Sequence, residues 1–178
     1  MRCSTLVALV PLLAAHSQGL IYLQRGQLPE AETQFRKVTT LAPRDAAGHI
    51  NLGLVYAESG RCALARPLLD KARAEFERLQ SPGLAMALLE QARCTKDPRA
   101  ALALLDRAHT IATAHSPSPR ALAEIELSQA MTLDRMRGGD RSRAIALAVQ
   151  ARGRFVAIGA GSAPRVRRLD AWVAARSR

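Results

Sequence analysis

GLIYLQRGQLPEA, at residues 19–31, recurs 34 residues later as GLVYAESGRCALA, at residues 53–65. Four positions are identical in the two copies, and they pair Gly19 with Gly53, Tyr22 with Tyr56, Gly26 with Gly60 and Ala31 with Ala65. Self-similarity at this period is typical of proteins built from stacked repeats and not of a single globular core. The sequence therefore predicts a repeated structural unit.

Composition indicates that this unit is helical. Of the 178 residues, 48% are apolar but only 3% are aromatic, so the interior must be built from Ala, Leu, Val and Ile. Ala and Leu are good helix formers. Since no stretch alternates in the manner of a half-buried strand, we expect an all-α fold. The length would hold about four helix pairs of roughly 34 residues each.

Prolines and glycines divide the chain at the intervals expected for short helices. Pro29, Pro98 and Pro119 fit the first turn of a helix, where the missing N–H has no helical partner to lose. From these positions the sequence predicts helices over 12–25, 29–42, 46–59, 63–79, 82–94, 98–114, 119–137, 141–158 and 164–176.

The residues shared by the two copies resemble the tetratricopeptide repeat (TPR) family, whose unit is a helix-turn-helix of about 34 residues. The resemblance rests in residues 12–45 on Gly19, Tyr22, Gly26, Ala31, Phe35 and Pro43, and in residues 46–79 on Gly53, Tyr56, Gly60 and Ala65. It implies a right-handed α-solenoid of antiparallel helix pairs, closed by a C-terminal capping helix.

The repeat frame also implies an organisation for the whole chain. An N-terminal apolar segment (1–11) precedes TPR 1 (12–45) and TPR 2 (46–79), degenerate TPR-like pairs follow at 82–115 and 119–158, and a linker with a basic capping helix occupies 159–178. In the capping helix, Leu169, Trp172 and Val173 form an i, i+3, i+4 stripe that would pack on the preceding pair.

Each shared residue has a packing role in this frame. The small residues Gly19 and Gly53 would let the two helices of a pair approach closely. Gly26 and Gly60 follow the first helices, and we expect them to adopt the left-handed conformation that ends a helix.

The sequence carries none of the common catalytic motifs. It lacks a GxxxxGK[ST] phosphate loop, an HExxH zinc site and a GxSxG nucleophile turn. The four His and three Cys residues are scattered, without the spacing of metal ligands. We therefore expect no enzymatic activity and no cofactor or metal, and we expect the cysteines to be reduced thiols.

Binding of another protein is the function that this architecture predicts, because the first helices of successive repeats line a concave surface that can hold a peptide. The candidate groove residues are His16, Leu20, Leu23, Ile50, Asn51, Leu54, Met86 and Glu90. The set is mostly apolar. One TPR subgroup holds a peptide C-terminus with a clamp of Lys and Asn side chains, but the positions of its first Lys and Asn hold His16 and Leu20 here, and only Asn51 agrees, so this clamp is disfavoured. The sequence favours an interaction module or assembly scaffold, with a second copy of the chain or an extra capping helix as the alternative occupant of the groove.

Positive charge is concentrated at the C-terminal end. Residues 135–178 contain 11 Arg against two acids, a net charge of +9, which leaves +2 of the total +11 for residues 1–134. The candidate basic face consists of Arg141, Arg152, Arg165, Arg167 and Arg168. It would favour acidic protein partners. Electrostatic binding of nucleic acid is the alternative, although the aromatic residues that stack on bases are almost missing.

Three C-terminal stretches resemble a second group of proteins. ALAEIELSQAM (121–131), GDRSRAIALAVQARGRF (139–155) and VRRLDAWVAAR (166–176) resemble the tails of large bacterial signalling proteins in which TPR arrays follow a Ser/Thr kinase domain. Because the chain has no kinase residues, this resemblance implies a regulatory TPR segment related to such bacterial proteins.

The first residues, MRCSTLVALVPLLAAHS, resemble a secretory signal peptide, with a basic start and an apolar run. Cleavage after Ala15 would remove the start of a predicted helix, so we expect retention and a cytoplasmic location, with the periplasm or secretion as the alternative. No run reaches the roughly 20 apolar residues that are needed to span a bilayer.

Overall fold

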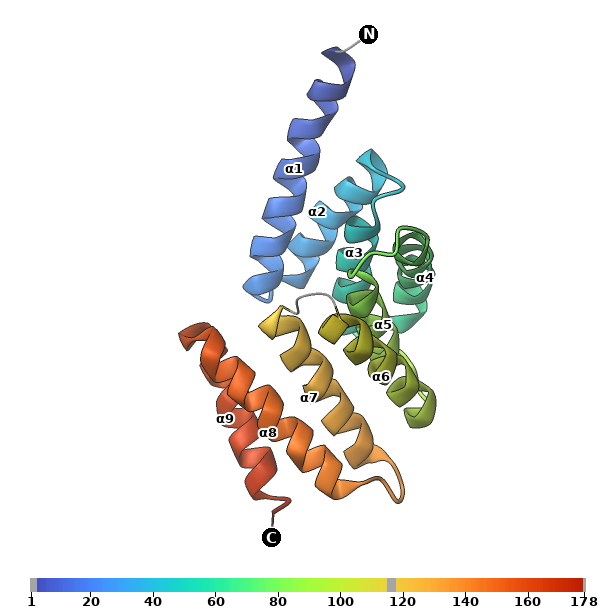
Figure 1. Cartoon of the computed structure of the whole chain (residues 1–178). Helices are drawn as coiled ribbons and strands as arrows, with labels where there is room; N and C mark the ends of the chain where they lie inside the picture. The colour runs from blue at the N-terminus through green and yellow to red at the C-terminus, as the bar shows by residue number, and fades with distance from the viewer. Residues whose placement is uncertain (1–2, 115–117, 178) are drawn as a thin grey trace. The chain divides into compact units, whose positions relative to one another are not determined.

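A computed structural model of the chain describes residues 3–114 and 118–177, and every regular element in them is helical. In chain order the elements are α1 (Cys3–Gln24), α2 (Leu28–Leu41), α3 (Ala46–Glu58), α4 (Cys62–Arg78), α5 (Leu84–Arg93), α6 (Pro98–Ala114), α7 (Pro119–Arg135), α8 (Arg141–Ile158), the short 3₁₀ helix η1 (Ala160–Ser162) and α9 (Ala163–Ala174) (Figure 1). The predicted all-α, TPR-like class is confirmed.

The predicted helix boundaries agree with the observed ones to within two residues, apart from one N-terminus. Helix α1 begins at Cys3 and not at residue 12, so most of the segment 1–11 is the start of a helix and not a separate turn. Residues 1–2 of that segment and residue 115 of the third predicted pair lie outside the described residues. The division into four repeat pairs stays a prediction.

The chain forms two compact units, Met1–Glu90 (unit 1) and Gln91–Arg178 (unit 2). In unit 1, α1 packs on α2, α2 on α3 and α3 on α4. The largest fully buried side chains include Phe35 of α2 and Leu69 of α4. The first part of α5 joins this unit through Ala87, which packs with Ala46 and Ala72.

The repeated small residues of unit 1 are where two helices meet. A Cβ atom added to Gly19 would lie 2.7 Å from the Phe35 ring, and one added to Gly53 would lie 2.7 Å from the Leu69 side chain. Ala31 and Ala65, on the facing helices, are completely buried. The close approach predicted from the repeat is therefore confirmed, since no larger side chain fits these contacts without displacing a neighbour.

Gly26 and Gly60 end the first helices as predicted. Their φ angles are +71° and +73°, which is the left-handed region that most residues avoid. The following residues then donate backbone N–H groups back to the helix, from Gln27 to the carbonyl of Tyr22 at 2.9 Å and from Arg61 to that of Tyr56 at 2.7 Å. These bonds satisfy carbonyls that the helix end would leave unpaired.

In unit 2, α6 packs on α7, α7 on α8 and α8 on α9. Its core combines small residues of α7 and α8 with Phe155 and with Leu169 of α9, and Trp172 and Val173 pack against it. The stripe predicted for the last helix thus faces α8. In the degenerate pairs the small and apolar positions of the repeat frame hold Ala101, Leu105, Ala108, Ala144, Ala148 and Ala151, which are buried, and Gly139, which is half-buried.

Aspartates begin three of the helices. Asp45 accepts hydrogen bonds from the backbone N–H groups of Ala47 and Gly48, and Asp140 accepts one from Arg143. Asp97, which precedes Pro98, accepts bonds from two backbone N–H groups of the first turn of α6. Such caps satisfy donors that the first turn of a helix leaves free.

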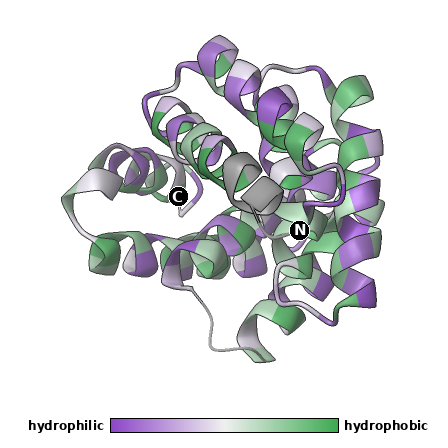
Figure 2. Ribbon diagram, turned by 90° about the horizontal axis from the view of Figure 1, so that it is seen from above, coloured by the Kyte–Doolittle hydropathy of each residue, from purple (hydrophilic) through white to green (hydrophobic). Residues whose placement is uncertain are grey.

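Most helices carry hydrophobic and hydrophilic residues on different sides (Figure 2), but α1 does not. It contains no Asp, Glu, Lys or Arg, and its N-terminal half extends beyond α2 (Figure 1). Val10 and Leu13 in that half are exposed. Within the described residues, no helix is long and apolar enough to cross a membrane.

The expectation of reduced cysteines is wrong for two residues. Cys62, the first residue of α4, and Cys94, which follows α5, are both disulfide-bonded. The separation of the two residues in the sequence, without a CxxC pair, carried no signal of this.

Candidate partner-binding surfaces

The first candidate surface lies on the first helices of unit 1. We call it the first-helix face and define it by Leu20 and Leu23 of α1 and Asn51 and Leu54 of α3. Leu20 is 37% exposed, and the other three are half-buried. The apolar residues at the hairpin crossings, Phe35 and Leu69, are by contrast fully buried. The first-helix face is therefore accessible apolar surface beside a closed core.

Two other predicted groove residues, His16 and Met86, are also half-buried. The His16 ring packs edge-on against Phe35, with 6.1 Å between the ring centroids. Met86 packs against the core cluster that contains Ala46 and Ala87. Both side chains pack partly in the interior, so neither is counted in the first-helix face.

The structure corrects the assignment of Ile50 and Glu90 to the groove, because both are buried. Ile50 is 8% exposed and packs with Ala46, Ala72 and Ala87, while Glu90 is 1% exposed. Helix α3 packs on α2 and α4, and its residues Ala46 and Ile50 also pack with Ala87 of α5, which leaves a narrower free stripe on α3 than the helical period alone suggests.

A polar cluster that the sequence analysis missed joins α2 to α3 in unit 1. The Glu32 carboxylate accepts hydrogen bonds from Arg61 at 2.6 Å, from Arg36 at 2.9 Å and from the Tyr56 hydroxyl at 3.2 Å. The Arg61 guanidinium also lies over the Tyr56 ring, 4.7 Å from its centroid. Partial burial by itself raises the pKa of Glu32, but these donors outweigh it and hold the pKa below its ordinary value.

The lowered pKa predicts how this cluster responds to acid. Because the folded state holds the proton less tightly than the unfolded state, the contribution of Glu32 to stability is complete above the unfolded pKa of about 4.3 and is lost as pH falls through the lower folded pKa. We expect Glu32→Gln to lower the free energy of unfolding by about 1–2 kcal/mol at pH 7. Urea titrations should show the difference from wild type shrinking towards pH 3.

Glu30→Gln is the matched control, because Glu30 is an exposed acid in the first turn of the same helix. We expect it to change stability by less than about 0.5 kcal/mol at pH 7. A Glu32→Gln effect that is equally large at pH 7 and pH 3 would show that the carboxylate charge is not what stabilises the cluster.

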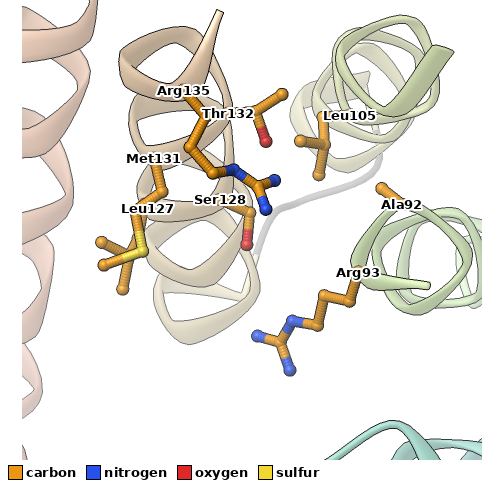
Figure 3. Close-up of a pocket in the computed structure, with 8 residues that line it drawn as sticks. All are labelled: Ala92, Arg93, Leu105, Leu127, Ser128, Met131, Thr132 and Arg135. Carbon is orange, nitrogen blue, oxygen red and sulfur yellow. The ribbon is translucent and has the colours of Figure 1, made fainter. Parts of the chain in front are cut away.

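The second candidate surface is a pocket in unit 2, of about 320 Å³ (Figure 3). It is lined by Ala92 and Arg93 at the end of α5, by Leu105 of α6, and by Leu127, Ser128, Met131, Thr132 and Arg135 of α7. Arg135 lies along the side of α7 that carries Ser128 and Thr132 and that is turned towards Leu105 and Ala92 (Figure 3). Its lining combines apolar side chains with two guanidinium groups, and we call it the α7 pocket.

The two arginines of the α7 pocket differ in their surroundings. Arg93 donates to the Glu124 carboxylate at 3.1 Å, and Arg165 of α9 approaches the same carboxylate at 3.3 Å. For Arg135, an exposed side chain, no hydrogen bond or ion pair is found within the described part of the chain. In the pocket, the charge of Arg93 is therefore neutralised by Glu124, whereas the guanidinium of Arg135 is available to bind an anion.

Residues 19–60 match the family model described as TPR repeat. This range runs from the crossing glycine of α1 to the left-handed glycine that ends α3. This stretch is similar to a TPR repeat. TPR repeats generally mediate protein–protein interaction, and the family is typically a non-catalytic interaction module. No curated protein matches the chain.

Unit 2 is further held by charged contacts that occupy most of the predicted basic face. Arg141 donates two hydrogen bonds to the backbone carbonyl of Arg176, at 2.9 and 2.6 Å, and Arg152 pairs with Asp170. Arg165, besides approaching Glu124, lies 5.8 Å from the Phe155 ring centroid.

Arg167 and Arg168 are exposed and have no such contact within the described residues. Of the five residues predicted for the basic face, Arg141, Arg152 and Arg165 are therefore engaged within unit 2, which corrects the assignment of these three to a free basic face. The acids that neutralise this region are Glu124, Asp170 and, for Arg176, Asp134 at 2.6 Å.

A buried acid links three helices of unit 2. Glu126 of α7 is completely buried, and Nε of Arg154 on α8 donates to both of its carboxylate oxygens, at 3.0 and 2.9 Å. Nε2 of His109 on α6 lies 3.7 Å from one of these oxygens. No group of three His, Cys, Asp or Glu side chains that could hold a metal is found among the residues described.

Proposed function

We propose that this TPR chain is a non-catalytic interaction module that binds a segment of a partner protein on the first-helix face of unit 1. The observation that carries the proposal is that apolar residues of α1 and α3 stay accessible beside a closed core. Leu20 is 37% exposed, and Leu23 and Leu54 are half-buried, whereas Phe35 and Leu69 at the hairpin crossings are fully buried. Exposed apolar surface on a soluble domain is typical of an interaction site.

The composition of the first-helix face favours a partner with apolar anchor residues. Leu20, Leu23 and Leu54 carry no charge, and the Asn51 side chain, on α3 like Leu54, can bond to a backbone peptide group of an extended segment. Binding would remove the leucine side chains from water, and each fully buried leucine contributes about 1.5–3 kcal/mol. Positive charge on the chain, +11 in total, would speed the encounter with an acidic partner.

The double variant Leu20→Glu with Leu54→Glu tests this proposal. We expect it to lose partner binding by at least about a hundredfold, because two carboxylates would have to be buried against apolar anchors. Partners are first identified by mass spectrometry after capture from nuclease-treated native lysate, and the affinity of the purified partner is then measured by calorimetry.

Leu41→Glu with Leu64→Glu is the matched control, since both leucines are exposed, at 46% and 48%, and lie on second helices. It introduces the same charge and should bind as wild type does. Retained binding by a folded Leu20→Glu, Leu54→Glu variant would refute the assignment of the face. A wild-type dimer in sedimentation that this variant abolishes would identify the partner as a second copy of the chain.

A further inference from the structure

We propose that the α7 pocket of unit 2 is a second binding site, and that it takes an acidic peptide segment in which a carboxylate lies next to an apolar side chain. This inference does not depend on the first-helix face, because the two surfaces lie in different units. It rests on the geometry of the pocket, on the free guanidinium of Arg135 and on the apolar floor beside it.

The available charge in the pocket is Arg135. Other arginines of unit 2 form ion pairs with acidic side chains of the same unit: Arg143 pairs with Asp106 at 2.9 Å, Arg154 with Glu126 at 2.9 Å and Arg176 with Asp134 at 2.6 Å. Among the described residues, no acid forms an ion pair with Arg135. A planar guanidinium matches a carboxylate with two parallel hydrogen bonds, so an acidic group from outside the chain is the complement.

The rest of the lining selects for an apolar neighbour of that carboxylate. Leu105 and Ala92 form a buried floor, at 1% and 3% exposed, while Met131 at the edge is 47% exposed. An unbranched methionine adapts its shape to different side chains. A volume of about 320 Å³ is at the lower end of the range for ligand pockets and suits a few side chains of a peptide.

The same lining disfavours the other occupants. Nucleic acid binding draws on several phosphate contacts and on aromatic stacking, and the pocket offers one free cation and no aromatic residue. A second copy of the chain would bring a net charge of +11 towards a surface that is itself cationic. An acidic peptide needs no aromatic stacking, and its charge is opposite to that of the chain.

The hydroxyl groups of Ser128 and Thr132 add a polar edge next to the guanidinium (Figure 3). A hydroxyl can donate to a carboxylate oxygen or accept from a peptide N–H. The carboxylate therefore binds at Arg135 beside these hydroxyls, and the apolar side chain that follows it in the segment lies over Leu105 and Ala92, on the side of Arg135 that faces α5 and α6 (Figure 3).

The test uses two fluorescein-labelled peptides of eight residues, one alternating Leu with Glu and the other alternating Leu with Gln. Fluorescence anisotropy with the full chain should show the Glu peptide binding at least about tenfold more tightly than the Gln peptide, which is the scale of one charge-assisted hydrogen-bonded pair. Arg135→Gln should remove that preference. Arg167→Gln, the matched control at an exposed arginine without a partner, should leave it within about twofold.

Several outcomes would overturn the inference. Equal binding of the two peptides, or equal losses in Arg135→Gln and Arg167→Gln, would reduce the effect to overall charge. Displacement of the Glu peptide by an oligothymidylate would favour nucleic acid, and a dimer that Arg135→Gln dissociates would favour a second copy. The Leu20→Glu, Leu54→Glu variant should keep the preference for the Glu peptide. A result that contradicts the proposal for the first-helix face can therefore be distinguished from one that contradicts the proposal for the α7 pocket.

Discussion

Ala65→Arg is expected to unfold unit 1. Ala65 of α4 is completely buried where α4 crosses α3, beside Gly53, a position with no room for even a Cβ atom without displacing Leu69. An arginine there would overpack the crossing and bury a charge with no acid to pair with it. Overpacking costs about 1–3 kcal/mol, and an unpaired buried charge costs several more. Their sum matches the stability of a typical small domain.

The measurement is thermal unfolding by circular dichroism, with hydrogen exchange to assign the loss to residues 3–90. Gln34→Arg is the control, because it adds the same charge to α2 at a partly exposed position. It should change stability by less than about 0.5 kcal/mol. Equal melting of the two variants would contradict the assignment of Ala65 to the helix crossing and, with it, the repeat frame.

Glu126→Ala has the second largest expected effect, and it acts on unit 2. Removing a carboxylate that is completely buried leaves a cavity and takes away both oxygens to which Arg154 donates. Breaking a buried ion pair costs about 3–5 kcal/mol. Since Arg154 is 38% exposed and can turn towards water, we expect about 3 kcal/mol. Urea unfolding at pH 7 checks this value.

A double-mutant cycle shows whether the loss belongs to the pair. Arg154→Ala alone leaves the Glu126 carboxylate buried without its arginine, so it should be at least as destabilising as Glu126→Ala. The double variant should be less destabilised than the sum of the two, by more than about 0.5 kcal/mol. Strict additivity would show that the two side chains do not stabilise unit 2 through each other.

Much of the fold could be predicted from local patterns. The helix boundaries follow from prolines in the first turn and from glycines past the last one, and these act through backbone conformation within a few residues. The crossing residues Gly19, Gly53, Ala31 and Ala65 were found because one helix pair is repeated in the sequence. The start of α1 at Cys3 was missed because a helix and a signal peptide both produce an uninterrupted apolar run.

The candidate sites were harder to predict, because they depend on which side chains meet from distant parts of the chain. Glu126 looks like a surface acid within AEIELSQ, yet its arginine lies 28 residues away. Helical periodicity placed Ile50 and Glu90 in the groove because it cannot show which neighbouring helix covers a given face. The α7 pocket had no sequence signal, since its lining comes from three separate helices.

The sequence by itself determined the helical repeat, the positions of the helices and the small residues at their crossings, because these depend on residue periodicity and on backbone conformations that only certain residues adopt. The tertiary structure alone decided how the charges are used. Arg141, Arg152 and Arg165 are engaged within unit 2, and Arg135 is left available. The net charge follows from the composition alone. Ion pairing depends on the distances between side chains from different helices, and these distances are fixed only when the helices pack.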